Sequence, residues 1–550
     1  MNTETCLVYP QNGHSNPGKY GRAPAYEGTG TEEMIRSLEA YGSYYVLEHG
    51  AKEKDYTDYC EKLERCGFTR YSSTVSNGNR FATYTDGENV VNVSYVRYHD
   101  TDRYVTADVS YVAIAVDLEK NSALPPKGEP YRTVTTGQVT YIWGGFIIRL
   151  PDGRFLNLDI YTANEEQTDL LYRTLCEMNV LEGKPVIAAW MFSHAHGDHV
   201  NAILGLLKKY SGQVEIQRII HGFPGEETYV GKNYMEYTMD NESRWMTFRS
   251  NEIKRLMDEN MPEGKFTVAH TGQVFEYPGA KIEVLFTSEN LYRQQMFDTN
   301  MSSVVYRYTL QGGTLLALGD AVDGEAKILR KIHGKALKSD AVVLAHHAFN
   351  GGDEELYHDI GAVAAIWPNT LEYLIERHCI GDYVNHFDPT IVKHNLIISQ
   401  DRTTMTLYPD MPAEEFDVFD RKLDVKPSPA VDYDSRRNPK NELTEVDLAK
   451  GYGNAPRYYG AGEETETLVK NEDEKTYQIT VRGTTDYSYD FYRNTLKRDG
   501  FWPMSKTEEA GRKSAVYASP LNEAVVSYSD GVLTVHVGPA GVNALHRDHE

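Results

Sequence analysis

The sequence has few cysteines, no long apolar run and no cluster of basic residues. Its five cysteines are scattered over 550 residues and include no Cys-x-x-Cys pair, which excludes a disulfide framework. We interpret them as small hydrophobic residues of the core. No stretch approaches the roughly 20 apolar residues that a membrane helix needs. These absences predict a protein without a membrane span.

The charge balance is strongly acidic, with a formal net charge of -24. Nucleic-acid binding normally requires a basic surface, so we expect a small-molecule substrate rather than a long nucleic acid. Residues 1–30 lack the charged and then apolar pattern of a secretory signal, and this predicts a cytoplasmic location. A homo-oligomer is compatible with the sequence. The content of 40% hydrophobic and 25% charged residues is typical of a globular fold.

The two ends of the chain resemble each other. A helical stretch at 55–66 precedes alternating, strand-like segments at 81–84 and 90–95. The same pattern returns near the other end, with these matches: Tyr56, Tyr59, Leu63, Gly67 and Phe68 with Tyr489, Tyr492, Leu496, Gly500 and Phe501, and then Tyr84, Asp86 and Gly87 with Tyr528, Asp530 and Gly531. We interpret the ends as copies of one module. The alternative is a chance likeness of two helix-plus-strand units.

The chain is predicted to contain four parts. These are an N-terminal α+β module (1–127), a catalytic α/β domain (128–411), a linker rich in Pro, Gly and charged residues (412–471) and a C-terminal α+β module (472–550). Within the second part, strands are expected at 139–143, 145–150, 154–159 and 186–193, and a helix at 165–179. Alternating strands and helices predict α/β layers.

The run His194-Ala195-His196-Gly197-Asp198-His199 carries three imidazoles and a carboxylate within six residues. It follows an apolar strand and precedes a helix-like stretch at 200–208. Extended residues two apart point to the same side, so His194 and His196 can bind one metal ion. Asp198 and His199 then reach a second ion. These ligand types suit Zn²⁺, Mn²⁺ or iron.

Two later strands also end in possible ligands. The stretch 314–320 ends in Gly319-Asp320, and the stretch 340–347 ends in His346-His347. A carboxylate from a separate strand can bridge two cations that lie roughly 3.5–4 Å apart, and Asp320 is our candidate for that bridge. Gly319-Asp320 alone could also be an ordinary turn.

Together these motifs resemble the successive metal motifs of the metallo-β-lactamase superfamily. Residues 300–305, followed by 319–321 and 346–347, are similar to the branch that contains DNA-uptake competence proteins and phosphorylcholine esterases. The resemblance implies a four-layer αβ/βα sandwich with small α+β modules at both ends. It further implies two divalent metal ions, Zn²⁺ or Mn²⁺, with the following ligands: Asp198, His199, Asp320 and His347 for one ion, and His194, His196 and Asp320 for the other.

The resemblance assigns further roles and leaves one gap. It implies that Asp159 orients histidine ligands from beneath the metals and that His346 faces the substrate. Many family members supply another histidine in a Gly-His-Thr segment, where this chain has Thr299-Asn300-Met301-Ser302-Ser303. Water, substrate or Asn300 can fill that position, and both Asn300 and Ser302 are expected to support the ligands or contact the substrate. His221 and His270 are two further candidates for the missing ligand.

The expected activity is metal-dependent hydrolysis by a metal-bound hydroxide, because zinc lowers the pKa of bound water to about 7. Asp198, Asp320 and His346 are the expected catalytic residues, with His346 protonating the leaving oxygen. A small phosphodiester or phosphoester is the favoured substrate. A carboxylic ester, lactone or thioester is an alternative substrate. A metal-binding scaffold with partner-recognition modules is an alternative of another class.

Overall fold

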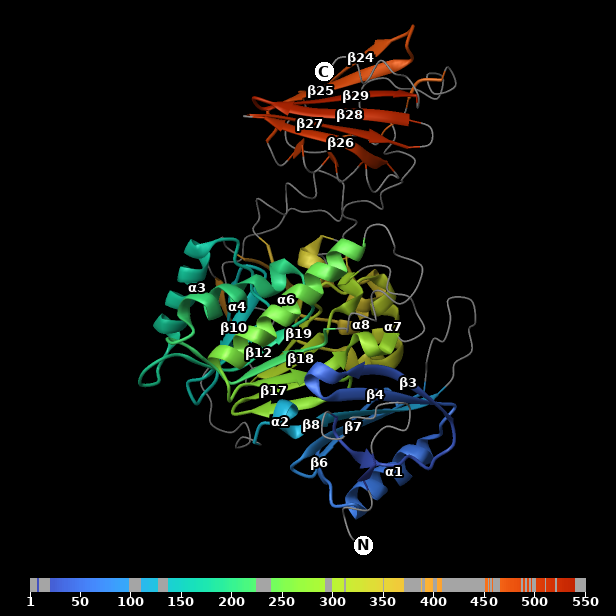
Figure 1. Ribbon diagram of the computed structural model, residues 1–550, viewed down its shortest axis with the longest axis vertical. Coiled ribbons are helices and arrows are strands. Elements are labelled where there is room, and N and C mark those ends of the chain that lie inside the picture. The colour runs from blue at the N-terminus through green and yellow to red at the C-terminus, as the bar shows by residue number, and fades with distance from the viewer. Residues whose placement is uncertain are drawn as a thin grey trace. The chain divides into compact units, whose positions relative to one another are not determined.

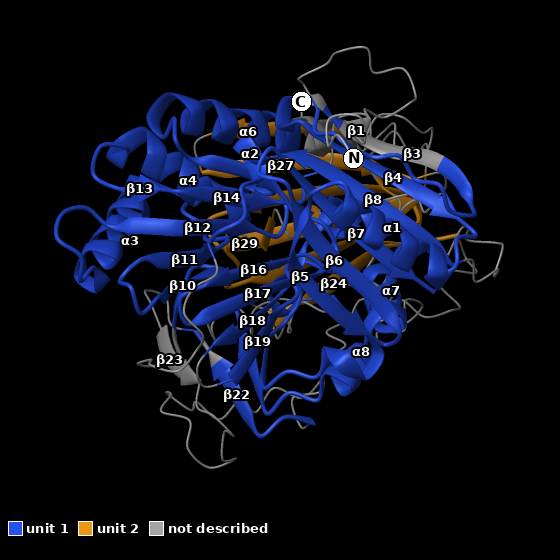
Figure 2. Cartoon of the chain, turned by 90° about the horizontal axis from the view of Figure 1, so that it is seen from below, with its two compact units in different colours: residues 1–371, 386–425 blue, residues 372–385, 426–550 orange. Residues whose placement is uncertain are grey.

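The computed structural model divides the chain into two compact units, residues 1–371 with 386–425 and residues 372–385 with 426–550 (Figure 2). It describes residues 7–8, 20–97, 110–126, 137–223, 239–291, 299–310, 313–349, 351–369, 387, 391–398, 403–407, 451–453, 455, 458, 465–485, 488–489, 492–493, 496, 501–509, 511–519 and 522–539. No helix in these ranges is long and apolar enough to cross a membrane.

The first unit contains two mixed β-sheets between residues 137 and 407. The first sheet has the order β15-β14-β12-β11-β10-β9-β23, with β13 (Glu215–Ile216) beside β12. Its strands are β9 (Gly137–Ile142), β10 (Gly145–Arg149), β11 (Phe155–Leu158), β12 (Val186–Phe192), β14 (Arg218–His221), β15 (Lys265–Val268) and β23 (Thr403–Leu407). Its neighbours β11, β12, β14 and β15 are parallel, so their carboxyl ends meet at one edge of the sheet.

The second sheet follows the chain in simple order from β16 to β22. Its strands are β16 (Val274–Tyr277), β17 (Ala280–Phe286), β18 (Val305–Leu310), β19 (Gly313–Ala317), β20 (Ala341–Val343), β21 (Ala364–Trp367) and β22 (His394–Ile397). The first four strands are antiparallel, whereas β19, β20, β21 and β22 are parallel. Their carboxyl ends therefore also share an edge.

The two sheets pack face to face, with helices on their outer sides (Figure 1). One buried cluster joins inward residues of both sheets, such as Tyr141 and Phe146 with Ile282 and Tyr308. A second cluster joins the outer face of the first sheet to α3 (Glu165–Met178), α4 (Gly197–Tyr210) and α6 (Met239–Asn260). The helices α7 (Asp323–His333) and α8 (Glu354–Ile360) follow strands of the second sheet. The predicted four-layer αβ/βα sandwich is confirmed.

The N-terminal module is a six-stranded antiparallel sheet with the order β3-β4-β8-β7-β6-β5, and it carries the helix α1 (Glu53–Arg65). Its strands are β3 (Thr31–Leu38), β4 (Ser43–His49), β5 (Thr69–Ser76), β6 (Asn79–Thr85), β7 (Asn89–Val96) and β8 (Tyr111–Leu118). Tyr56, Tyr59 and Leu63 of α1 are buried against one face of this sheet. The opposite face meets the sandwich, where Phe81 stacks on His333 at 6.1 Å.

The C-terminal module is also a six-stranded antiparallel sheet, with the order β24-β25-β29-β28-β27-β26. Its strands are β24 (Thr467–Asn471), β25 (Thr476–Arg482), β26 (Trp502–Glu509), β27 (Arg512–Ala518), β28 (Asn522–Ser529) and β29 (Val532–Pro539). The module begins before residue 472, because β24 belongs to its sheet and Tyr452 and Tyr458 lie in its core. Most of the expected linker, residues 412–450, lies outside the described residues.

The two modules have the same strand order along the chain, and their cores contain matching residues. Tyr56, Tyr59, Leu63 and Phe68 are buried in one core, as Tyr489, Tyr492, Leu496 and Phe501 are in the other. A pair of tilted tyrosine rings recurs as well: Tyr26 with Tyr59 at 5.7 Å, and Tyr458 with Tyr492 at 6.0 Å. The duplication stays a proposal, and these features support it.

One of the expected matches between the modules is wrong. Asp86-Gly87 lies between β6 and β7, whereas Asp530-Gly531 lies between β28 and β29, which correspond to β7 and β8. The sequence offset that relates Tyr56 to Tyr489 instead pairs Tyr84 with Tyr517 and Tyr95 with Tyr528. Both turns contain Asp-Gly because each follows an antiparallel strand that must reverse tightly. The similarity of the turns caused the misalignment.

Candidate metal centre

The candidate ligands lie just beyond the carboxyl ends of three strands. β12 ends at Phe192, two residues before His194, and α4 begins at Gly197 within the histidine motif. β19 ends at Ala317, shortly before Asp320, and β20 ends at Val343, before His346 and His347. Strand ends from both sheets therefore bring distant chain segments to one edge of the sandwich.

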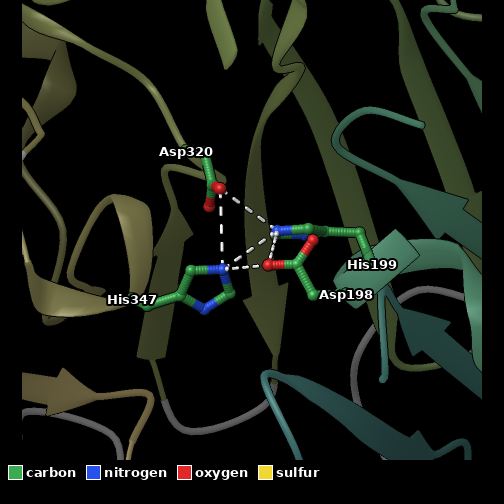
Figure 3. A group of neighbouring side chains, drawn as sticks. All are labelled: Asp198, His199, Asp320 and His347. Atoms are coloured by element: carbon green, nitrogen blue, oxygen red, sulfur yellow. Dashed lines mark hydrogen bonds and ion pairs between the residues drawn. The ribbon is translucent and has the colours of Figure 1, made fainter. Parts of the chain in front are cut away.

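Asp198, His199, Asp320 and His347 form one group that can hold a metal ion (Figure 3). His347 Nε2 lies 3.0 Å from Asp198 Oδ2 and 3.6 Å from Asp320 Oδ2. His199 Nε2 lies 3.2 Å from the same Asp320 oxygen. Within the group, the four ligand atoms are within 4.8 Å of one another.

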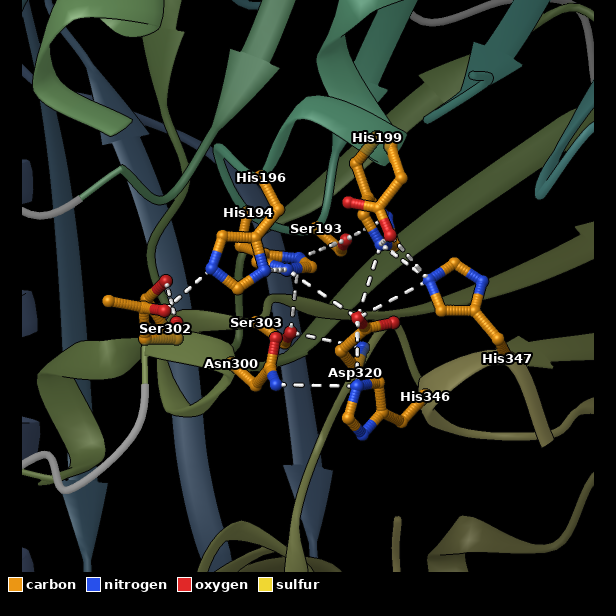
Figure 4. A network of polar contacts seen from close by, with 12 residues as sticks. Ser193, His194, His196, His199, Asn300, Ser302, Ser303, Asp320, His346 and His347 are labelled. Atoms are coloured by element: carbon orange, nitrogen blue, oxygen red, sulfur yellow. Dashed lines mark hydrogen bonds and ion pairs between the residues drawn. The ribbon is translucent and has the colours of Figure 1, made fainter. Parts of the chain in front are cut away.

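His194, His196 and Asp320 form a second group, which shares Asp320 with the first. His194 Nε2 is 2.8 Å from His196 Nδ1 and 3.6 Å from Asp320 Oδ2. Figure 4 shows Asp320 between this pair of histidines and His347. The Asp320 carboxylate can therefore contribute a ligand atom to both groups.

Asp159 supports the histidines from a buried position after β11. Its Oδ2 is 3.0 Å from His199 Nδ1 and accepts a hydrogen bond from the Ser193 hydroxyl at 2.8 Å. Its Oδ1 accepts the Ser193 backbone N–H. The Ser193 hydroxyl is also 3.0 Å from His194 Nδ1. The Asp159 carboxylate thus contacts Nδ1 of His199 in the first group, and the Ser193 hydroxyl contacts Nδ1 of His194 in the second.

The segment that replaces the expected Gly-His-Thr forms the short helix η4 (Thr299–Ser302). Thr299 Oγ1 is 2.6 Å from His196 Nε2, and Asn300 Nδ2 is 3.4 Å from His346 Nε2 (Figure 4). The hydroxyl of Ser302 donates to the Thr299 carbonyl, whereas Ser303 Oγ lies 3.4 Å from His194 Nδ1. Sequence reasoning selected Ser302 and missed Thr299, Ser303 and also Ser193.

The two adjacent histidines lie on strained backbone. His346, His347 and Ala348 have φ angles of 47°, 56° and 63°, in the left-handed region that costs of order 1–3 kcal/mol per non-glycine residue. This turn directs His347 toward Asp198 and places His346 Nε2 3.8 Å from Asp320 Oδ2. Such strain persists only where the surrounding structure enforces it.

Burial and neighbouring charges shift the pKa values of several groups in the site. Burial alone would lower the pKa of His199, but Asp320, Asp159 and Asp198 outweigh it and raise that pKa well above the usual value. Burial alone would raise the pKa of Asp320, but His199 and His347 hold it well below the usual range. By contrast, burial and neighbouring histidines lower the pKa of His194. These directions keep Asp320 ionised and His194 neutral, the forms that bind metal, whereas His199 would have to lose a proton when a metal binds.

The donor set fits divalent metal ions. Apart from Asp320, which both groups share, four of the five residues are buried or partly buried histidines, and the fifth is Asp198. Imidazole and carboxylate ligands suit Zn²⁺, Mn²⁺ and iron alike. His194 and Asp320 are at most 2% exposed, so these polar groups are positioned for a cation rather than for bulk water. Both groups accept a metal on chemical grounds.

His221 and His270, the two alternative candidates for the missing ligand, contact residues outside the site. His221 packs against the rings of both Tyr41 and Phe266. His270 lies between Asp117 of the N-terminal module and Glu289, at 3.0 and 2.9 Å. Within the described part of the chain, neither belongs to a group that could hold a metal ion. Both are structural residues in this arrangement.

Comparison with known proteins gives distant structural neighbours. No family model and no curated protein sequence matches the chain. A variant metallo-β-lactamase from Cronobacter sakazakii is 18% identical, with a TM-score of 0.21, over 36% of this chain and 64% of its own. A variant of the β-hydroxylase CmlA is 10% identical, with a TM-score of 0.28, over 65% of this chain and 79% of its own.

A variant flavo di-iron protein from Thermotoga maritima is also similar, with 13% identity and a TM-score of 0.18 over 49% of this chain and 51% of its own. At such identities and TM-scores, the neighbours carry no argument about this protein. The fold and the site rest on the topology and the side-chain geometry described above. Together these define a protein with an αβ/βα sandwich that carries, at one edge, two His/Asp groups that could hold metal ions.

Proposed function

We propose that this protein is a hydrolase of the metallo-β-lactamase superfamily that depends on two divalent metal ions. The observation that carries the proposal is the convergence of three chain segments on Asp320, which belongs to both candidate metal groups. A shared carboxylate between two ligand sets is the arrangement of two-metal hydrolases. The narrower assignment to the branch of competence proteins and phosphorylcholine esterases, like the cytoplasmic location, stays a prediction.

The proposed ligands are those of the two groups. Asp198, His199, Asp320 and His347 would hold one ion, and His194, His196 and Asp320 the other. When bound, two such cations lower the pKa of a shared water and polarise an oxygen of the substrate. The second set offers one protein ligand fewer, so we expect it to bind its metal more weakly.

The chain's own residues would position the reactants and move protons. Asp198 is the most exposed of the ligand candidates, with 48% of its side chain accessible, and would orient the attacking water. His346 is outside both metal groups but lies within 3.8 Å of Asp320, so it can donate a proton to the leaving oxygen. Asn300, which contacts His346, would hold that imidazole in place.

We favour a small phosphodiester or phosphoester as the substrate. The strongly acidic chain disfavours a long polyanion, whereas a metal edge can bind a single phosphate despite the surrounding charge. A carboxylic ester, lactone or thioester is the alternative, because the same centre can polarise a carbonyl oxygen.

The test is hydrolysis by protein that has been chelated and then reloaded with Zn²⁺ or Mn²⁺. Bis(4-nitrophenyl) phosphate would be assayed beside a panel of lactones and thioesters, with metal content measured in parallel. We expect His196→Ala and Asp198→Ala to reduce metal-dependent turnover to background. His358→Ala is the matched control, because His358 is an exposed histidine on α8 paired with Glu354. Full turnover by the site variants would refute the proposal.

A further inference from the structure

One arginine of α6 lies directly against the histidine motif. A Cβ atom added to Gly197 would lie 3.1 Å from Arg249 Nη2. Gly197 stands between the ligand candidates His196 and Asp198, so the guanidinium borders the backbone of the metal loop. α6 also packs against η4, whose Thr299 contacts His196. The helix therefore flanks the His194–His196 side of the site.

Two large aromatic side chains accompany this arginine on the exposed side of α6. Trp245 and Phe248 are each 58% exposed, and their rings meet edge to face at 5.8 Å. The Arg249 guanidinium lies 5.9 Å from the Trp245 ring. Residues three and four positions apart share one side of a helix, so the three side chains form a continuous surface. We call Trp245, Phe248 and Arg249 the α6 triad.

The packing of α6 does not need these aromatic rings. Other side chains of the helix supply its buried contacts, among them Met246, Ile253 and Met257, while Ser250 contacts the Tyr41 hydroxyl at 3.0 Å. Tryptophan and phenylalanine are more often buried than exposed, and a cluster of exposed apolar groups marks an interaction site. The position of this cluster beside the metal loop suggests the substrate as the interacting molecule.

Arg249 and the two rings together favour an anion that carries an aromatic group, because the arginine adds a positive charge to an otherwise acidic edge. Asp198 and Asp320 make the metal edge acidic, and the chain as a whole carries a net charge of -24. An arginine at this edge can bind phosphate oxygens through two parallel N–H donors. Exposed aromatic rings next to it can stack on a planar group. A small neutral aliphatic ester would need neither the arginine nor the exposed rings.

We propose that the α6 triad is the substrate-recognition subsite, and that it selects a small phosphoester carrying an aromatic group. Arg249 binds the phosphate, and Trp245 with Phe248 contacts the aromatic group. This inference rests on the proposed hydrolase function and narrows its substrate class.

The experiment measures binding of two non-hydrolysable probes to the metal-loaded full-length protein by calorimetry. Phenylphosphonate carries an anionic group and an aromatic ring, whereas methylphosphonate carries the anionic group alone. We expect the wild type to bind phenylphosphonate about tenfold more tightly, an increase within the range that stacking on one aromatic ring contributes. Trp245→Ala combined with Phe248→Ala should remove the preference, and Arg249→Ala should weaken both probes at least tenfold.

Controls separate recognition from folding. Arg255→Ala removes an arginine of the same helix that pairs with Glu252 and Glu259, and it should leave both affinities unchanged. Trp245→Phe and Arg249→Lys keep much of the packing and should show intermediate affinities. Circular dichroism and metal content must match the wild type for every variant compared.

The outcomes distinguish this inference from the proposed function. Equal binding of both probes by the wild type, or unchanged affinities in the triad variants, would overturn the subsite. If the variants behave as expected but no phosphoester is hydrolysed, the subsite stands and the proposed hydrolase activity fails. If phosphoesters are hydrolysed but the variants keep wild-type KM and affinity, the subsite alone fails.

Discussion

His270 links the N-terminal module to the sandwich through two buried carboxylates, and its replacement should have a large and pH-dependent cost. Its Nε2 is 3.0 Å from Asp117 Oδ2 on β8, and its Nδ1 is 2.9 Å from Glu289 Oε1 in η3 (Ser288–Leu291). All three side chains are at most 2% exposed. His270→Gln would leave two buried carboxylates without their cation, which costs about 3–5 kcal/mol when one partner of a buried ion pair is removed.

The pH dependence of this cost follows from the direction in which the pKa of His270 is shifted. Burial alone would lower the pKa of His270, but Glu289 and Asp117 outweigh it and raise the pKa from 6.5 to about 10. A raised pKa in the folded state stabilises the protein fully below the unfolded-state pKa. This stabilisation is lost as the pH rises from 6.5 through 10. The difference between wild type and His270→Gln should therefore be largest near pH 6 and shrink toward pH 10.

Urea unfolding of the full-length protein at a series of pH values measures this difference. His333→Gln is the matched control, because His333 lies in the same interface, 2.8 Å from Ser76 Oγ and 2.7 Å from the Leu285 carbonyl oxygen. Burial lowers the pKa of His333 to about 4, so its contribution is present above pH 6.5 and is lost as the pH falls toward 4. Equal stability of wild type and His270→Gln at pH 6, or a cost that is independent of pH, would refute the reasoning.

Three further predictions concern the site and the modules. Asp159→Asn should weaken metal binding about 10–100-fold, as measured by competition with a chelator, because it removes the negative charge and puts an amide N–H in place of one of the two oxygens that contact Ser193 and His199. Gly319→Ala should lower the unfolding midpoint and the metal content, because Gly319 has a φ of 57° and its added Cβ would lie 2.7 Å from Ser193 Cβ; a variant with the wild-type midpoint would contradict this. Leu63→Ala and Leu496→Ala should each cost about 2–5 kcal/mol in urea unfolding, since both side chains are fully buried in equivalent positions; a large cost at only one of them would argue against equivalent cores.

The ligand-bearing strands could be predicted because their signals are local. The apolar stretch 186–193 forms β12 over Val186–Phe192, and Asp320 follows β19 as expected. A buried strand followed by polar ligands is visible in a single window of sequence. The meeting of these strand ends depends on two sheets packing against each other, and it could be anticipated only from the family resemblance.

The rest of the site could not be predicted because its residues carry no local signal. Thr299, Ser303 and Ser193 contact histidines through hydroxyls, and a hydroxyl residue next to a strand has many other uses. Arg249 comes from a helix that was not anticipated, since its chain segment is mostly polar and its apolar face is narrow. Its position beside Gly197 results from helix packing alone.

The two terminal modules share a strand order but differ in the side chains on one face of the sheet. In the N-terminal copy, Tyr45 stacks on His270, Phe81 stacks on His333, and Asp117 pairs with His270. The strand registers place Gln478, Ser514 and Gly538 at the corresponding positions of the C-terminal copy. These residues offer no aromatic ring and no charge, although the helix-facing cores match. The contacts of the N-terminal module with the sandwich therefore depend on particular side chains of its sheet face, and not on the strand order that the two modules share.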